Sequence, residues 1–275
     1  MKAICLRSVC TRSSDLFFRA SDRITTRIRK TRSFTGWSYK EAAINYSDYG
    51  KGKCLVFLHG WGGEIASFQG LADRLSSEFR VILIDLYGFG KTPHPAFPLT
   101  IGDYAAGVSA LLDEIQAEKV VLVGHSFGGR IAMRLAAGKT KTKADGVVLI
   151  DSAGVPPRRG VKYHLKVASY KIAKRLKLKK LPQGSKDYRQ LSDVMKRTFV
   201  NVVNESSEKD ARGIIAPTLL IWGAEDKDTP LYMCRKLKKL IKGSQKIVLE
   251  RCGHFCYLQK PDFVYRVIRA FRRSV

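Results

Sequence analysis

A serine flanked by glycines is the first residue in the chain that could do chemistry. It lies in the segment 124–129 (GHSFGG), directly after the apolar run 120–123. Glycines on either side allow the chain to turn sharply from a strand into a helix, and this turn lifts the Ser126 hydroxyl clear of the sheet. The amino end of the following helix favours developing negative charge. The pattern therefore predicts a serine that attacks an acyl carbonyl.

Such a serine needs hydrogen-bond donors for the oxyanion that its attack creates. A second glycine-rich turn, 58–63 (LHGWGG), follows the apolar run 54–58. Its backbone can reach the same point as the amide after Ser126, so the N–H groups of Trp61 and Phe127 are predicted to form the oxyanion hole. Removing one such donor typically costs about 3 kcal/mol of barrier. His59, in the same turn, is predicted to bond within its loop and not to act as the base.

The general base must come from elsewhere in the chain. His254 follows the last strand-like run, 247–249, on a loop before the final helix. Side chains at the carboxyl ends of parallel strands gather at one edge of the sheet, which is where function is expected. His125 is a rival, but it adjoins the serine and should point away from it. His94 lies in a proline-rich loop and His164 in a basic segment, so His254 is the predicted base.

A carboxylate is needed to hold the histidine tautomer and to stabilise the imidazolium. The loop 223–230 (GAEDKDTP) follows the strand-like run 218–222 and offers Asp226. Glu225 and Asp228 are close competitors. A carboxylate in this loop could also simply cap the helix that begins near its end.

These loops need a parallel sheet to bring them together. Short apolar runs alternate with amphipathic stretches, which predicts a mainly parallel sheet with helices on both faces. The alternation stops at 152–211, where two helical patterns occur. The predicted strands are 54–58, 81–84, 120–123, 147–150, 218–222 and 247–249, and the predicted helices are 65–78, 101–116, 127–138, 161–180, 186–204, 230–241 and 261–273. The predicted units are a basic, poorly ordered segment 1–36, a core of 37–151 and 212–275, and a helical lid insertion, 152–211.

Taken in order, these motifs resemble the α/β-hydrolase family over about residues 40–273. The matching places are the turn at His59, the segment 85–90 (DLYGFG), the elbow at Ser126, the loop of Asp226 and the dipeptide Gly253-His254. The family's acid lies three residues after the glycine that follows the sixth parallel strand, so the resemblance selects Asp226. It implies a serine hydrolase that cleaves an ester or related acyl bond through an acyl-enzyme, without a metal or organic cofactor.

The same fold also supports activities other than ester hydrolysis by serine. Family members that attack with aspartate are excluded by Ser126. Carbon–carbon bond hydrolases usually carry tryptophan just after the catalytic histidine, and here Phe255 and Tyr257 occupy that region, which weakens this alternative but keeps it open. A non-catalytic binding protein of the same fold is the other alternative, and the intact set of serine, histidine and aspartate speaks against it.

Charge is the unusual part of the composition. Of 275 residues 45% are hydrophobic and 27% charged, as in ordinary globular proteins, but the net charge is +26. The excess lies in the segments 1–33, 152–186 and 235–275, around a near-neutral remainder. Nucleic-acid binding domains carry their charge on the binding fold, so a nucleic-acid partner is disfavoured. The expected partner is a small acyl substrate. An anionic membrane surface could also bind the basic lid helix, unless its lysines are merely solvated.

Cysteine spacing and the N-terminus bear on cofactors and location. Six cysteines without a CxxC spacing predict reduced thiols, and the alternating Cys252, His254 and Cys256 lack a fourth ligand for zinc. No run reaches 18 uncharged apolar residues. The arginine-rich residues 1–33 resemble an organelle transit peptide. The expected location is cytoplasmic, with organelle targeting as the alternative.

Overall fold

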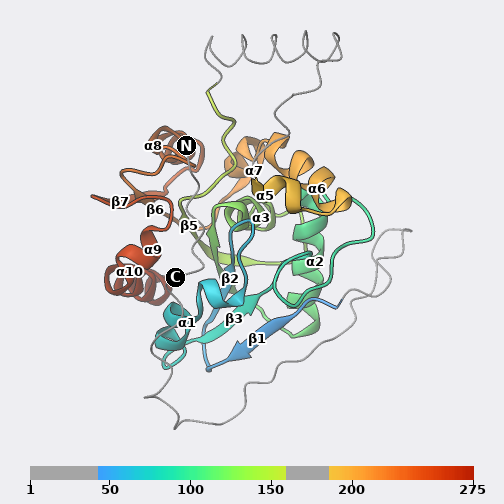
Figure 1. Cartoon of the computed structure of the whole chain (residues 1–275). Helices are drawn as coiled ribbons and strands as arrows, with labels where there is room; N and C mark the ends of the chain where they lie inside the picture. Colours follow the sequence, from blue (N-terminus) through green and yellow to red (C-terminus); the bar gives the residue numbers. More distant parts are fainter. Residues whose placement is uncertain (1–42, 159–185) are drawn as a thin grey trace, which may run out of the picture.

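A seven-stranded sheet runs through the part of the chain that the computed structural model describes, residues 43–158 and 186–275 (Figure 1). The strand order is β1-β3-β2-β4-β5-β6-β7; β1 pairs antiparallel with β3, and all other neighbours are parallel. The strands are β1 (Tyr46–Tyr49), β2 (Cys54–Leu58), β3 (Arg80–Ile84), β4 (Val120–His125), β5 (Ala144–Ile150), β6 (Thr218–Gly223) and β7 (Gln245–Leu249). The predicted α/β fold with a mainly parallel sheet is confirmed.

Helices cover both faces of this sheet (Figure 1). They are η1 (Ile65–Ser67), α1 (Gln69–Leu75), α2 (Ile101–Glu114), α3 (Phe127–Ala136), α5 (Lys186–Gln190), α6 (Asp193–Asn204), α7 (Glu208–Gly213), α8 (Leu231–Leu240), α9 (Cys256–Gln259) and α10 (Pro261–Ser274). Alternate residues of β2 face opposite cores: Val56 packs with α2, α3 and α8, and Phe57 packs with α1 and α10. Burial on both faces explains why the central strands are continuous apolar runs.

The structure differs from the predicted elements in several places, and the short helices α7 and α9 were not predicted. The edge strand β1 (Tyr46–Tyr49) was not predicted, because only its first residue is buried and it lacks an apolar run. The stretch 65–78 forms the short helices η1 and α1 instead of one helix. The stretch 186–204 forms α5 and α6, and Ser192 separates them by accepting a hydrogen bond from the Met195 amide at 3.3 Å, as a helix N-cap does.

Helix α6 packs on loops that follow β2 and β3. The Thr198 hydroxyl accepts a hydrogen bond from the Leu99 amide at 3.0 Å, and the Phe199 ring lies 5.1 Å from the Trp61 ring. Figure 1 shows α5, α6 and α7 grouped on one side of the molecule.

Several predictions concern residues outside the described ranges. These are the basic segment 1–36, the basic lid helix 161–180, His164, Cys5 and Cys10. The other four cysteines are free thiols. Within residues 43–158 and 186–275, no helix combines the length and the apolar composition that crossing a bilayer requires.

Candidate active site

Ser126 occupies a strained turn between β4 and α3. Its φ of 48° and ψ of −109° place a non-glycine residue in a sparsely populated region of backbone space. A Cβ on Gly124 would lie 2.6 Å from the carbonyl oxygen of Gly128, and a Cβ on Gly128 would lie 2.0 Å from that of Leu58. Both glycines are therefore required by close backbone approach, which is the reason that the sequence pattern carries them.

A cavity of about 800 Å³ opens over this turn. Ser126, His254, Trp61 and Phe127 all line it. Among the described residues, the backbone N–H groups of Trp61 and Phe127 donate to no protein acceptor. Two uncommitted amides beside a serine are what an oxyanion requires, because each can donate to developing negative charge without first breaking another hydrogen bond.

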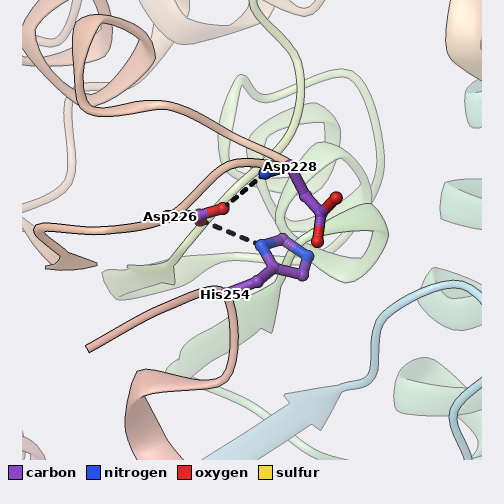
Figure 2. Close-up of side chains that lie close together, drawn as sticks. All are labelled: Asp226, Asp228 and His254. Atoms are coloured by element: carbon purple, nitrogen blue, oxygen red, sulfur yellow. Dashed lines mark hydrogen bonds and ion pairs between the residues drawn. The ribbon is translucent and has the colours of Figure 1, made fainter. Parts of the chain in front are cut away.

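Asp226 and His254 lie in contact, although 28 residues separate them (Figure 2). Nδ1 of His254 lies 2.9 Å from Oδ2 of Asp226. Asp226 follows β6 and its side chain is fully buried, whereas the His254 side chain is 13% exposed, on the cavity wall. The loops after β6 and β7 thus deliver an acid and an imidazole to one edge of the sheet.

Hydrogen bonds hold the Asp226 carboxylate on all sides. Oδ1 accepts from the amides of Asp228 and Thr229 at 2.8 and 2.9 Å, and Oδ2 accepts from the Thr229 hydroxyl at 2.6 Å and from His254. Burial alone would raise the pKa of Asp226, but the hydrogen bond and charge of His254, with the bonds from Thr229, outweigh it and hold the pKa below its usual value of 3.8. Asp226 is therefore an anion near neutral pH.

The tautomer of His254 follows from this partner. A carboxylate only accepts, so Nδ1 carries the proton and Nε2 is left with a free lone pair. Burial lowers the pKa of His254, but the hydrogen bond and charge of Asp226, and the charges of Asp228 and Asp151, outweigh it and raise the pKa above 6.5. The ring is thus a stronger base than a free imidazole and is stabilised when it takes a proton.

Asp228 places a second carboxylate beside the ring. Figure 2 shows Asp226 and Asp228 on either side of the imidazole, and one ligand atom from each of the three residues lies within 4.8 Å of the others. Three such donors could hold a cation. Because the oxygens of Asp226 already accept four hydrogen bonds, the arrangement fits the orientation of the histidine better than metal ligation. The exposed Asp228 adds negative charge near the ring.

Replacing Asp228 by Asn should shift the pH dependence of the reaction. The variant keeps the backbone amide that supports Asp226 but removes a charge that favours the imidazolium, so the pKa of His254 should fall. Because the base works when neutral, the acid limb of kcat/KM should move to lower pH by the same amount. The profile measured at low ionic strength checks this, since salt screens an exposed charge.

Glu225→Gln is the matched control for this shift. Glu225 lies in the same loop and is exposed, but it does not contribute to the raised pKa of His254. Its profile should coincide with that of the unaltered protein. An unmoved acid limb in Asp228→Asn, or an equal movement in Glu225→Gln, would show that Asp228 has no specific effect on the base.

The serine and the histidine share the cavity without bonding directly. Within the described residues no hydrogen bond joins Ser126 Oγ to the His254 ring. Such bonds are often long in the absence of substrate and tighten as the reaction proceeds. Ser126 and His254, the predicted nucleophile and base, therefore line the same cavity. We expect the hydrogen bond that carries the proton between them to form when substrate binds.

His125 has a role that its sequence position did not reveal. It is almost fully buried, and its Nε2 donates to the backbone carbonyl of His254 at 2.8 Å. Burial, followed by the nearby charge of His254, lowers the pKa of His125 to about 3, so the ring stays neutral and keeps that donor. His125 is thus fixed as a support for the loop of the base, not as a rival to it.

Asp151 is a second residue that the sequence analysis missed. It follows β5, is fully buried and has a φ of 41°. Oδ1 accepts from the Gly223 amide at 2.8 Å, and Oδ2 accepts from the Cys256 amide at 3.3 Å. One carboxyl group therefore ties together the ends of β5 and β6 and the loop of His254. Its position at the end of a predicted strand was the only sequence signal.

The other two histidines of the described ranges, His59 and His94, do not line the cavity. His59 donates from Nδ1 to the Gly60 carbonyl at 2.8 Å and accepts the Leu86 amide on Nε2 at 3.0 Å, which confirms the prediction that it bonds within its own loop region. Burial lowers its pKa, so it stays neutral. His94 contacts Ser192 at 3.4 Å and does not line the cavity.

The sequence of the chain is similar to those of known hydrolases. The model of the alpha/beta hydrolase family matches residues 55–267. The chain belongs to this family. It is 27% identical over 254 residues to the 2-hydroxy-6-oxo-2,4-heptadienoate hydrolase of Pseudomonas putida, covering 82% of this chain and 91% of that protein. It is 25% identical over 258 residues to the pimeloyl-[acyl-carrier protein] methyl ester esterase of Vibrio parahaemolyticus, covering 84% and 98%.

A solved structure supports the same fold. The esterase from Exiguobacterium antarcticum superposes with a TM-score of 0.70 at 21% sequence identity, covering 86% of this chain and 97% of that one. Relatives of this alpha/beta hydrolase therefore include both an esterase and a hydrolase that acts on a dienoate.

Proposed function

We propose that the protein is a serine hydrolase that cleaves carboxylic esters through an acyl-enzyme. The observation that carries the proposal is the convergence of Ser126, the His254–Asp226 pair and two uncommitted amides around one cavity. The groups follow the ends of β2, β4, β6 and β7, and together they meet the requirements of nucleophile, base, orienting acid and oxyanion donors.

The first half of the reaction forms the acyl-enzyme. Nε2 of His254 takes the proton from Ser126 Oγ as the oxygen attacks the ester carbonyl carbon. The carbonyl π electrons move to the oxygen, and the resulting oxyanion accepts hydrogen bonds from the amides of Trp61 and Phe127. Asp226 stabilises the imidazolium. The imidazolium then gives its proton to the leaving alcohol as the ester C–O bond breaks.

The second half releases the acid. A water molecule gives a proton to Nε2 of His254 and attacks the acyl carbon, which forms a second oxyanion in the same hole. The imidazolium protonates Ser126 Oγ as the acyl bond breaks, which restores the serine. Neither half-reaction, as written, consumes a metal or an organic cofactor.

The lining of the cavity supports a mainly apolar substrate. Trp61, Phe127, Phe199 and Met233 are among its wall residues, and Phe255 lies at the mouth with 41% of its surface exposed. Residues 152–211 are proposed as a lid, and the α6 side chains Phe199, Val202 and Val203 support this by lining the cavity. Membrane association through the basic helix 161–180 depends on residues outside the described ranges.

A carbon–carbon bond hydrolase is the second candidate. The Pseudomonas putida relative is named for hydrolysis of 2-hydroxy-6-oxo-2,4-heptadienoate, and the same three side chains could serve that chemistry. Phe255 follows His254 where such enzymes usually carry tryptophan, and its ring lies 5.3 Å from the imidazole. Ester cleavage therefore remains the preferred proposal.

A fluorophosphonate probe and two substrate classes test the proposal. The probe should label Ser126, identified by peptide mass spectrometry, because only an activated serine reacts. Turnover of methyl and p-nitrophenyl esters should exceed turnover of 2-hydroxy-6-oxo-2,4-heptadienoate. The reverse order would favour the carbon–carbon bond hydrolase. Absence of labelling would favour a non-catalytic binding protein of this fold.

A further inference from the structure

One buried cation in the cavity wall has no part in the mechanism above. Arg130 lies four residues after Ser126 on α3, which is about one helical turn and 6 Å along the helix axis. It lines the same cavity as Ser126 and His254, yet only 8% of the residue is exposed. A charged side chain this deep normally has an ionic partner, because desolvating an unpaired charge is costly.

Arg130 has no carboxylate partner among the described residues. Its Nη1 donates to the backbone carbonyl of Glu205, whereas Nε and Nη2 have no acceptor within the described ranges. The adjoining segment 159–185 cannot supply a carboxylate either, because it contains neither aspartate nor glutamate.

Glu205 and Asp210, the carboxylates that pair with Arg134 on the same helix, are already engaged. Arg134 bonds to Glu205 at 2.5 Å and to Asp210 at 2.7 Å, and Lys139 bonds to Asp210 at 2.6 Å. Arg134 and Lys139 therefore take both carboxylates, and Arg130 bonds only to a backbone carbonyl. Burial lowers the pKa of Arg130 to about 10, against the charge of Glu205, so the guanidinium remains charged near neutral pH.

The charges near the reaction centre favour one placement of an anionic group on the substrate. Asp228 lies beside His254, which protonates the leaving alcohol in the proposed mechanism, so the alcohol part of a substrate lies next to a carboxylate. Arg130 lies one helical turn from Ser126 in the wall of the same cavity. The wall also includes apolar side chains, among them Phe127, Val155 and Val202. A carboxylate beside the imidazole disfavours an anionic alcohol part, whereas a cation in the wall suits an anionic acyl chain.

We propose that Arg130 forms a carboxylate subsite and that the cavity takes esters whose acyl chain ends in a carboxylate, the half-esters of aliphatic dicarboxylic acids. A guanidinium presents paired N–H donors that match the two oxygens of a carboxylate. The assignment of substrate class rests on the proposed ester hydrolysis, whereas the anion subsite itself is a binding property.

A matched series of substrates tests the subsite. Monomethyl esters of the acids from succinate to suberate are each compared with the methyl ester of the monocarboxylic acid in which a methyl group replaces the free carboxylate. Methanol release gives kcat/KM. At the best chain length the half-ester should be preferred by about tenfold to a hundredfold, as expected for a hydrogen-bonded charge pair.

Arg130→Gln separates recognition from support of the fold. Glutamine retains an N–H donor for the Glu205 carbonyl but lacks the charge. The preference for the half-ester should disappear, chiefly through KM, while turnover of the uncharged ester is retained. Arg130→Lys should keep part of the preference. If Arg130 only anchors α6 to the core, both substrates will lose activity equally and the preference will survive, which would overturn the proposal.

Arg158→Gln is the control for general electrostatic attraction. Arg158 is exposed next to Pro157 of the cavity wall, and its guanidinium lies 4.5 Å from the ring centre of Tyr232. This variant removes the same charge from the neighbourhood and should keep the preference. An equal loss in Arg158→Gln would assign the preference to the charge of the whole protein and refute a subsite at Arg130.

Binding to a catalytically inactive protein distinguishes failure of the subsite from failure of the proposed function. In a Ser126→Ala background, calorimetric titration with the monomethyl ester of adipate should show binding that Arg130→Gln abolishes. That result would sustain the subsite even if neither ester were hydrolysed and the fluorophosphonate left Ser126 unlabelled. Hydrolysis of the uncharged ester without preference or binding of any half-ester would refute the subsite alone.

Discussion

Ser126→Ala is expected to reduce kcat for a short ester by about 10⁶-fold, the scale on which a serine nucleophile acts within a triad. The variant loses the atom that forms the acyl-enzyme, while the oxyanion donors and the cavity remain. Substrate affinity should therefore change little. The measurement is kcat and KM for a p-nitrophenyl ester, with intact protein mass spectrometry to show that the burst of acyl-enzyme has disappeared.

Replacing His254, alone and together with Ser126, tests whether the two residues act as one catalytic unit. His254→Ala should cost about as much as Ser126→Ala, and the double variant should cost no more than either, because nucleophile and base act as a unit. Ser76→Ala changes a partly exposed serine whose hydroxyl donates to the Asp73 carbonyl; it is the matched control and should be fully active. Full activity in either active-site variant, or additive losses in the double variant, would contradict the proposed roles.

Asp226→Asn is expected to lower kcat by about 10⁴-fold with a small change in KM. Asparagine has nearly the same shape, but its carboxamide is uncharged and cannot stabilise the imidazolium. Its nitrogen can also turn towards Nδ1 of His254, where it would favour the tautomer whose Nε2 is protonated and cannot accept the proton of Ser126. The measurement is steady-state kinetics, with proton NMR of the imidazole to identify the tautomer.

The neighbouring acids decide whether this effect belongs to Asp226. Glu225→Gln and Asp228→Asn should each retain most of the activity, because neither side chain bonds to the histidine. A loss in Asp228→Asn as large as in Asp226→Asn would move the role of the acid to Asp228. Melting temperatures of the three variants show whether a loss of activity reflects the chemistry or the loss of the hydrogen bonds that Asp226 accepts from its own loop.

The strands of the core could be predicted because burial on both faces leaves an unambiguous signal. The run 54–58 is apolar at every position and forms β2 with the same bounds. The edge strand β1 gives no such signal, since three of its four residues are only partly buried and one neighbour fixes its pairing. The stretch 65–78 keeps a helical pattern, but the structure breaks it at Phe68, between η1 and α1.

The site could be predicted only in its local motifs. The glycines around Ser126 mark the elbow, and the family resemblance selected Asp226 as the partner of His254, which the structure places in contact with it. The supports could not be found in this way. Asp151 accepts hydrogen bonds from backbone amides that are 72 and 105 residues away in the sequence. Nothing in the sequence around Arg130 distinguishes it from other arginines on helices. Such pairings depend on the strand order, which no short motif encodes.

The carboxyl group of Asp151 sets limits on the conditions under which the protein operates. Burial, partly offset by hydrogen bonds from Cys256 and Gly223, raises the pKa of Asp151 to about 7. Between about pH 4 and this value the folded chain keeps a proton that the unfolded chain gives up, so the contribution of Asp151 to stability falls as the pH rises. A rise in pH that frees His254 for proton abstraction therefore also ionises a buried carboxyl group, and the folded protein becomes less stable over the same range in which its base becomes active.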